Sequence, residues 1–141
     1  MADTAPSLRL TGEGALKILR AAMDKAAAMG VPQCISVVDA GGHLLAFCRM
    51  DGAFVQSIDS SLKKAMTAAS YGKPTGGMDD AIAIKLAIAT EGKRVNLPGG
   101  LPVIVDGHVI GAIGVGSGTG ADDLEVARAG IAAIAGVQAL G

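Results

Sequence analysis

The stretch LPVIVDGHVIGAIGVGSG, residues 101–118, decides the fold because it predicts two strands joined by a tight turn. Asp106 and Gly107 form a typical two-residue hairpin turn between runs of apolar, β-branched residues. We predict one strand over residues 103–105 and its partner over residues 109–115. Strands joined by so short a turn run antiparallel, so this stretch predicts an antiparallel sheet.

A second hairpin is predicted in the N-terminal half, within CISVVDAGGHLLAFCRMDGA at residues 34–53. Its strands are expected at residues 34–38 and 44–50, and residues 39–42, Asp-Ala-Gly-Gly, have the composition of a turn. Two hairpins indicate a sheet that is mainly antiparallel.

Apolar residues at helical spacing predict four helices outside the hairpins. The first begins after the N-cap Thr11 and ends at Gly30, and the others cover residues 54–71, 78–89 and 122–135. In the helix at 54–71 the apolar stripe is expected to be buried, and Asp59 and Lys63 are spaced to pair on the solvent side. The residues of that stripe are Ile58, Leu62, Ala65, Met66 and Ala69.

The order α-β-β-α-α-β-β-α predicts an α/β fold of the α+β type, with helices flanking an antiparallel sheet of four to five strands. The optional fifth strand would lie near residues 96–100. A doubly wound parallel sheet is disfavoured because strands and helices do not alternate one for one. The chain of 141 residues fits a single domain, with residues 1–9 as a loose N-terminal arm.

The composition narrows the function classes. The net charge is −1 and no Lys/Arg cluster alternates with aromatic residues, so nucleic-acid binding is disfavoured. We see neither a secretory signal pattern nor an apolar run long enough for a membrane, and we expect a cytoplasmic protein. Cys34 and Cys48 are expected to be free, buried thiols in strands.

Two glycine-rich loops are candidate binding elements. The first, NLPGGLP at residues 96–102, offers Gly99 and Gly100, and the second, GVGSGTG at residues 114–120, offers Gly116 and Ser117. A phosphate loop is disfavoured in the second, because its spacing matches no phosphate-binding motif and two acidic residues follow it. Backbone N–H groups there could instead meet a carboxylate. The alternative for both loops is a purely structural connection.

Charged residues near these loops are candidates for ligand binding or catalysis. Lys64 falls at the boundary of the buried face of its helix, where a lysine can bind an anion or have a lowered pKa. The alternative is a surface lysine that buries its stem and keeps its charge in water. Arg49 and Asp51 lie on one side of a strand end and either pair with each other or face a ligand. Arg94 lies beside the first glycine-rich loop.

His43 and His108 each follow a hairpin turn, and both are candidate metal ligands. Their alternative is an exposed turn histidine. The spacing of His, Cys and acidic residues matches no zinc motif.

Four stretches together resemble the GlcG/HbpS family, which includes the C-terminal domain of PduO proteins. They are TGEGALKILRAAMDKAAAMG, VVDAGGHLLAFCRMDGA, KKAMTAASYGKPT and LPGGLPVIVDGHVIGAIGVGSGTGADDLEVARAG. The resemblance extends from about Leu10 to Ala135. It implies a profilin-like sandwich that forms homo-oligomers, and haem binding or haem-linked sensing in some members.

Three functions follow as hypotheses. The leading one is a small-ligand-binding protein with haem or another tetrapyrrole as ligand, held by His43 or His108 and by Arg49, Lys64 or Arg94. The second is an enzyme acting on a small oxyacid or carbonyl compound, with Lys64, Asp51 and His43 as catalytic residues and loop amides as an oxyanion hole. The third is a structural accessory subunit, and an accessory role in a catabolic pathway belongs to the leading hypothesis.

Overall fold

The structure is a computed structural model that describes residues 2–140. The predicted element order is confirmed. The elements are α1 (Gly12–Met29), β1 (Cys34–Asp39), β2 (Leu44–Arg49), α2 (Gln56–Tyr71), α3 (Asp80–Ala89), β3 (Gly100–Val105), β4 (His108–Gly116) and α4 (Gly120–Ile131).

The four strands form one sheet in the order β2-β1-β4-β3, and every neighbouring pair is antiparallel. The central pair β1–β4 therefore joins the two predicted hairpins side by side. Residues 96–99 form a loop and β3 begins at Gly100, so the optional fifth strand is absent from the described residues. Asp106 and Gly107 make the predicted turn, both with positive φ.

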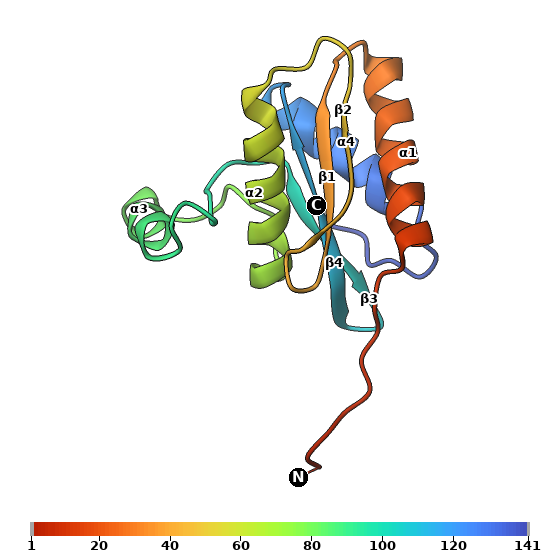
Figure 1. The fold of residues 1–141 in the computed structure, drawn as a ribbon, viewed down its shortest axis with the longest axis vertical. Helices are drawn as coiled ribbons and strands as arrows, with labels where there is room; N and C mark the ends of the chain where they lie inside the picture. Colours follow the sequence, from red (N-terminus) through yellow and green to blue (C-terminus); the bar gives the residue numbers. More distant parts are fainter. Residues whose placement is uncertain (1, 141) are drawn as a thin grey trace.

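Helices cover both faces of the sheet (Figure 1). α1 and α4 pack together on one face, and α2 lies on the other, mainly against β4 and β1. The larger apolar core lies between the sheet and the α1/α4 layer and includes Ile18, Ile35, Leu101 and Ile113. Residues 2–9 form neither helix nor strand and are exposed.

The ends of α1 follow the predicted capping chemistry. The Thr11 side chain accepts a hydrogen bond from the Gly14 N–H at 3.0 Å, and Gly30 adopts φ 72° at the C-cap. α4 begins at Gly120, two residues earlier than predicted, because Thr119 and Asp122 form a reciprocal capping box.

The predicted buried face of α2 is wrong for three of its five residues. Ala65 and Ala69 are buried, but Leu62 and Met66 are only half-buried and Ile58 is 38% exposed. The polar residues Ser57, Ser61 and Lys64 face the sheet instead. The Asp59–Lys63 ion pair is not formed in the structure.

Close approach of α2 to β4 explains this rotation. A side chain at Gly114 would overlap the Ser61 carbonyl, so the glycine allows the helix backbone to touch the strand. Only small residues fit such an interface, and Ser61 is further fixed by a 2.8 Å hydrogen bond to Ser36 on β1. The larger apolar side chains Ile58, Leu62 and Met66 are therefore more exposed than the helical pattern predicts.

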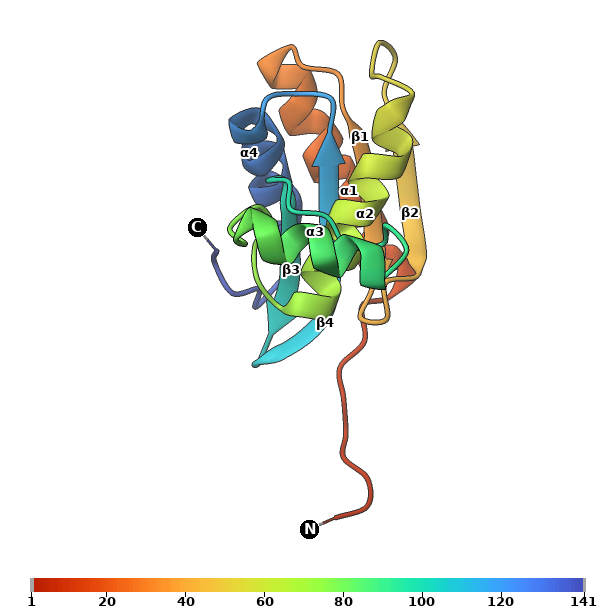
Figure 2. The same ribbon diagram turned by 90° about the vertical axis from the view of Figure 1, so that its left-hand side faces the viewer.

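α3 is unlike the other helices, since none of its residues is buried. Figure 1 shows it standing apart from the two helical layers, held by the loops at residues 72–79 and 90–99, and Figure 2 views the molecule from that side, with α3 in front. None of the helices between residues 2 and 140 combines the length and the apolar character that a membrane crossing requires.

Candidate functional site

A cleft of about 290 Å³ opens between α2 and the loop at residues 96–99. The first glycine-rich loop and Lys64 meet at this cleft, which Leu97 of the loop lines. Hydroxyl groups dominate its wall, with Phe54 and Leu97 exposed at its mouth. Its polar lining residues are Gln56, Ser57, Ser60, Lys64, Ser117 and Asp123.

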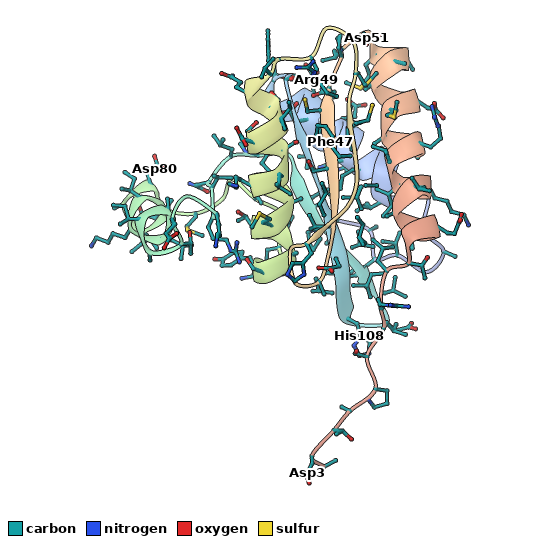
Figure 3. All side chains as sticks on the ribbon, in the orientation of Figure 1. Asp3, Phe47, Arg49, Asp51, Asp80 and His108 are labelled. Carbon is teal, nitrogen blue, oxygen red and sulfur yellow. The ribbon has the colours of Figure 1, made fainter. Side chains whose placement is uncertain are left out.

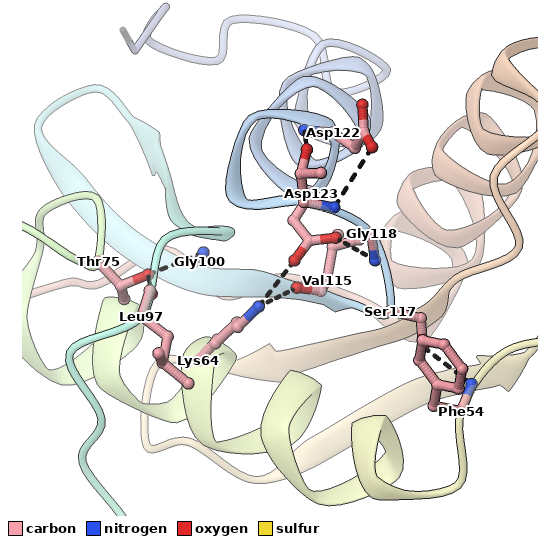
Figure 4. Close-up of polar contacts among 11 residues, drawn as sticks. Phe54, Lys64, Thr75, Leu97, Gly100, Val115, Ser117, Gly118, Asp122 and Asp123 are labelled. Atoms are coloured by element: carbon pink, nitrogen blue, oxygen red, sulfur yellow. Dashed lines mark hydrogen bonds and ion pairs between the residues drawn. The ribbon is translucent and has the colours of Figure 1, made fainter.

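A buried ion pair forms one side of the cleft (Figure 4). The Lys64 Nζ donates to Asp123 Oδ2 at 3.0 Å and to the Val115 carbonyl at 2.7 Å. Both side chains are almost fully buried, at 7% and 4% exposure. An ammonium group has three donors, so one N–H of Lys64 is left for a ligand.

Asp123 is held from both sides. Its Oδ1 accepts a hydrogen bond from the Gly118 N–H at 3.0 Å, while Oδ2 binds Lys64. Burial raises the pKa of the Asp123 carboxyl, and the hydrogen bond and charge of Lys64 oppose that rise. The pair leaves the cleft close to neutral, so that a ligand there would be held by hydrogen bonds more than by net charge.

The glycines of the first loop allow the chain to close over this pair. Gly99 has φ 115°, and a Cβ there would lie 2.8 Å from the Val115 carbonyl oxygen and 3.2 Å from the Lys64 Nζ. A Cβ at Gly100 would lie 2.6 Å from the Lys64 carbonyl oxygen. Both glycines thus pack tightly against α2 and β4, beside the cleft but outside its lining.

The second loop shapes the other end of the cleft. Ser117 has φ 97°, a left-handed conformation that costs about 1 kcal/mol or more for a non-glycine residue. Its Oγ accepts a hydrogen bond from the Phe54 N–H at 3.1 Å, which ties the loop to the start of α2. Gly116 lies against Ser57 and Ser60, where a Cβ would come within 3.0 Å of the Ser60 hydroxyl.

Gln33 is a polar residue that sequence reasoning missed. It is fully buried, and neither its amide nitrogen nor its amide oxygen has a hydrogen-bond partner among residues 2–140. Its amide lies close to the Asp123 carboxyl and lowers the pKa of that group, which favours the carboxylate. The two groups do not have the geometry of a hydrogen bond. A glutamine directly before a strand carries no sequence signal that it is buried.

His43 lies away from the cleft, in the turn between β1 and β2. Its Nδ1 is 3.2 Å from Asp39 Oδ1, and the same oxygen accepts hydrogen bonds from the backbone N–H groups of Gly41 and His43 at 2.9 Å. Burial alone would raise the pKa of Asp39, but these hydrogen bonds outweigh it and the pKa is lowered. The imidazole is 81% exposed, so Nε2 faces solvent.

The other predicted site residues are dispersed. Arg49 and Asp51 lie at the opposite end of the molecule from His108 (Figure 3), and no ion pair joins them. His108 is exposed at the tip of the β3–β4 hairpin. The Arg94 guanidinium donates to the Lys93 carbonyl at 3.3 Å. The structure therefore does not bring Lys64, Asp51 and His43 together.

Arg49 and Asp51 instead border an open groove of about 480 Å³ between α1 and the end of β2. Cys48 and Met50 line it too, whereas Cys34 is buried. Within residues 2–140, no three His, Cys, Asp or Glu side chains gather as a metal-binding cluster.

Comparison with known proteins places this architecture in a family. The family model described as haem-degrading protein HbpS-like matches residues 10–132. The chain belongs to the HbpS-like family. This confirms the resemblance predicted from the four sequence stretches.

Curated relatives of this HbpS-like chain span most of its length. The 15.0 kDa protein from the dhaT-dhaS intergenic region of Citrobacter freundii is 43% identical over 115 residues, which are 78% of this chain and 81% of the relative. Protein GlcG of Escherichia coli K12 is 39% identical over 107 residues, 75% of this chain and 80% of the relative.

Solved structures confirm the fold. Klebsiella pneumoniae protein ORFY matches with a TM-score of 0.86 and 33% identity, covering 94% of this HbpS-like chain and 96% of that chain. The haem complex of PduOC matches with a TM-score of 0.85 and 30% identity, covering 95% and 100%. A relative of the same fold thus binds haem.

Proposed function

We propose that this protein binds haem or a related tetrapyrrole on the face that carries His43. The observation that carries the proposal is the Asp39–His43 pair. A histidine that donates Nδ1–H to a carboxylate keeps its Nε2 lone pair free for a metal, and such partners orient metal-binding histidines in general. Membership of the HbpS-like family and the haem complex of PduOC support haem as the ligand.

The residues next to His43 fit an apolar macrocycle. Leu44 and Leu45 follow it directly and are 52% and 38% exposed, although both are large apolar side chains. Gly42 lies against the half-buried Met66 of α2, where its Cβ position would be 3.6 Å from the Met66 Cγ. We assign the axial position to His43 and the apolar wall to these three side chains.

The cations named from the sequence are not needed in this arrangement. Lys64 donates two of its N–H groups to Val115 and Asp123 in the cleft, away from His43. On so open a face the propionates stay in water, where their charges are solvated without a protein partner. When bound, the haem iron would supply the redox or ligand-sensing chemistry, and His43 would hold the iron and set the orientation of the ring.

Haem titration followed by absorbance tests this assignment. We expect a Soret shift that saturates at one haem per chain in the wild type and in His108→Ala. We expect His43→Ala to lose the shift or weaken binding at least 10-fold, with an unchanged far-UV spectrum. Equal binding by His43→Ala and the wild type would refute the axial role, and no Soret shift in the wild type would refute haem binding.

A second candidate function rests on the cleft. Three serine hydroxyls and the remaining N–H of Lys64 converge there, an arrangement suited to a small oxyacid or carbonyl compound. Pyruvate and lactate are suitable probes, with binding followed by chemical-shift changes. Shifts confined to the cleft in the wild type and lost in Ser60→Ala would support it, whereas no shifts at millimolar probe would reject it.

We further propose that the protein acts as a cytoplasmic homo-oligomer that is accessory to a catabolic pathway, within a single domain spanning the chain. The family resemblance and the apolar surfaces of α2 and α3 support this. Light scattering on the purified protein tests the assembly, and a monomer at micromolar concentration would contradict it.

A further inference from the structure

α3 is rich in apolar residues, yet none of them is buried. Its sequence is DAIAIKLAIA, none of its residues is buried, and Ile82, Ile84 and Ile88 are 54%, 62% and 75% exposed. Helices that are apolar around their whole circumference are normally buried, and exposed apolar clusters mark interaction surfaces. The described part of the chain therefore presents a helix that lacks its packing partner.

The base of α3 is firmly anchored, which makes the helix a fixed projection. Asp79 caps its first turn by accepting from the Ala81 N–H at 3.0 Å. The Asn96 amide joins the two supporting loops, accepting from the Met78 N–H at 2.9 Å and donating to the Met78 carbonyl at 2.6 Å. A ten-residue helix is marginal on its own in water, so further stability must come from packing.

α2 carries a matching apolar stripe on its outer flank. Val55 is 67% exposed and Ile58 38% exposed, and Leu62 is half-buried, so residues three and four apart line one side. The α3 helix of the same chain does not reach this flank, because its supporting loops run past Thr67 and Tyr71 on the other side of α2. A second copy of the chain has no such restriction.

Charges on the two helices are complementary when the helices run antiparallel. On α3, Asp80 precedes Lys85, and on α2, Asp59 precedes Lys63. Antiparallel docking would bring Asp80 near Lys63 and Lys85 near Asp59, whereas parallel docking would oppose like charges. Neither Lys63 nor Lys85 is in an ion pair within residues 2–140.

We propose that α3 of one copy docks antiparallel on the Val55–Ile58–Leu62 stripe of α2 in a second copy, and that the exchange is reciprocal. A single α3 has ten residues and is about 15 Å long, so it covers less area than the roughly 800 Å² per partner of a stable interface. A two-fold exchange buries both α3 helices and both stripes, which doubles the buried area. Haem binding at His43 is not needed for this exchange.

Light scattering coupled to size exclusion tests the docking at both surfaces. We compare the wild type with an α3 variant, Ile84→Asp/Ile88→Asp, and with an α2 variant, Ile58→Asp. Leu16→Asp is the matched control, since Leu16 is 55% exposed on α1, away from both helices. All four residues are at least one-third exposed, so far-UV spectra and the melting of the fold should be preserved.

We expect the wild type and Leu16→Asp to be oligomeric, and both interface variants to have a dissociation constant raised at least 100-fold. Reversing one charge with Lys85→Glu should weaken assembly, and adding Asp59→Lys should restore it. An oligomer that survives Ile84→Asp/Ile88→Asp would overturn the role of α3. Loss of the oligomer in Ile84→Asp/Ile88→Asp but not in Ile58→Asp would overturn α2 as the acceptor. A monomeric wild type that binds lipid vesicles through α3 would overturn the roles of both helices.

Discussion

At Lys64, the ammonium group is held by Asp123, which lies in a different helix and far along the chain. Removing one partner of a buried pair leaves an uncompensated charge in a poorly solvated place. We expect Lys64→Ala to lower the free energy of unfolding by about 3–5 kcal/mol. The exposed Lys17 on α1 is the control, and Lys17→Ala should change stability by about 0.5 kcal/mol or less.

Urea unfolding at pH 7 measures both lysine variants. A Lys64→Ala protein as stable as Lys17→Ala would mean that the ion pair does not stabilise the fold. Ligand binding in the cleft would then be the better explanation for the burial of Lys64. The residue type and its place on the helix predicted Lys64 as a candidate site residue. Its partner was hidden, because no local pattern links positions that far apart.

At Asp39, the lowered pKa has a defined consequence for stability. Because the folded-state pKa lies below the unfolded one, the carboxylate stabilises the fold at pH values above the ordinary aspartate pKa of about 4. This contribution is lost as the pH falls through the lowered value. When the pH falls from 6 to 2.5, the free energy of unfolding measured with urea should therefore drop less in Asp39→Asn than in the wild type. Parallel drops in the two proteins would contradict a stabilising role for the hydrogen bonds to Asp39.

At the scale of elements, the fit between α2 and β4 depends on one glycine. Gly114→Ala would place a Cβ on the Ser61 carbonyl and force the helix away from the sheet. We expect a loss of about 3 kcal/mol or more, at the upper end of overpacking effects. Gly12→Ala, with open space around its Cβ position, should be close to neutral in the same thermal unfolding experiment.

The elements also show what the sequence could and could not predict. Turn residues such as Asp106-Gly107 and caps such as Thr11 act locally, so the hairpins and helix ends were predicted within a few residues. The buried face of α2 was predicted wrongly, because hydrophobicity favours Ile58 and Leu62 while the space left by Gly114 admits only small side chains. That contact is set by tertiary packing and leaves no periodic signal.

At the scale of the whole molecule, the predicted site residues are dispersed, with Arg94 and His108 outside the three regions that hold the others. Lys64 and Ser117 line the cleft, His43 lies in the β1–β2 turn, and Arg49 and Asp51 border the groove at the end of β2. The sequence identified suitable residue types, but only the sheet order shows which of them share a region. The glycine-rich half supplies the loops together with Ser117 and Asp123, and the N-terminal half supplies Lys64 and the serines of α2.

Ligand binding at one of these regions should stabilise the whole fold. A ligand at 100 times its dissociation constant adds about 2.7 kcal/mol if it binds only the folded state. We expect haem to raise the melting temperature of the wild type and of His108→Ala by several degrees, and to leave His43→Ala unchanged. Equal shifts in all three proteins would indicate binding that does not involve His43.

The most direct measurement is a crystal structure of the haem-loaded protein, because it shows the atom bound to the iron. Our account predicts Nε2 of His43 on the iron, Nδ1 still on Asp39, and Leu44 and Leu45 against the ring. Iron bound by His108, or haem seated in the cleft beside Lys64 with His43 in solvent, would contradict it.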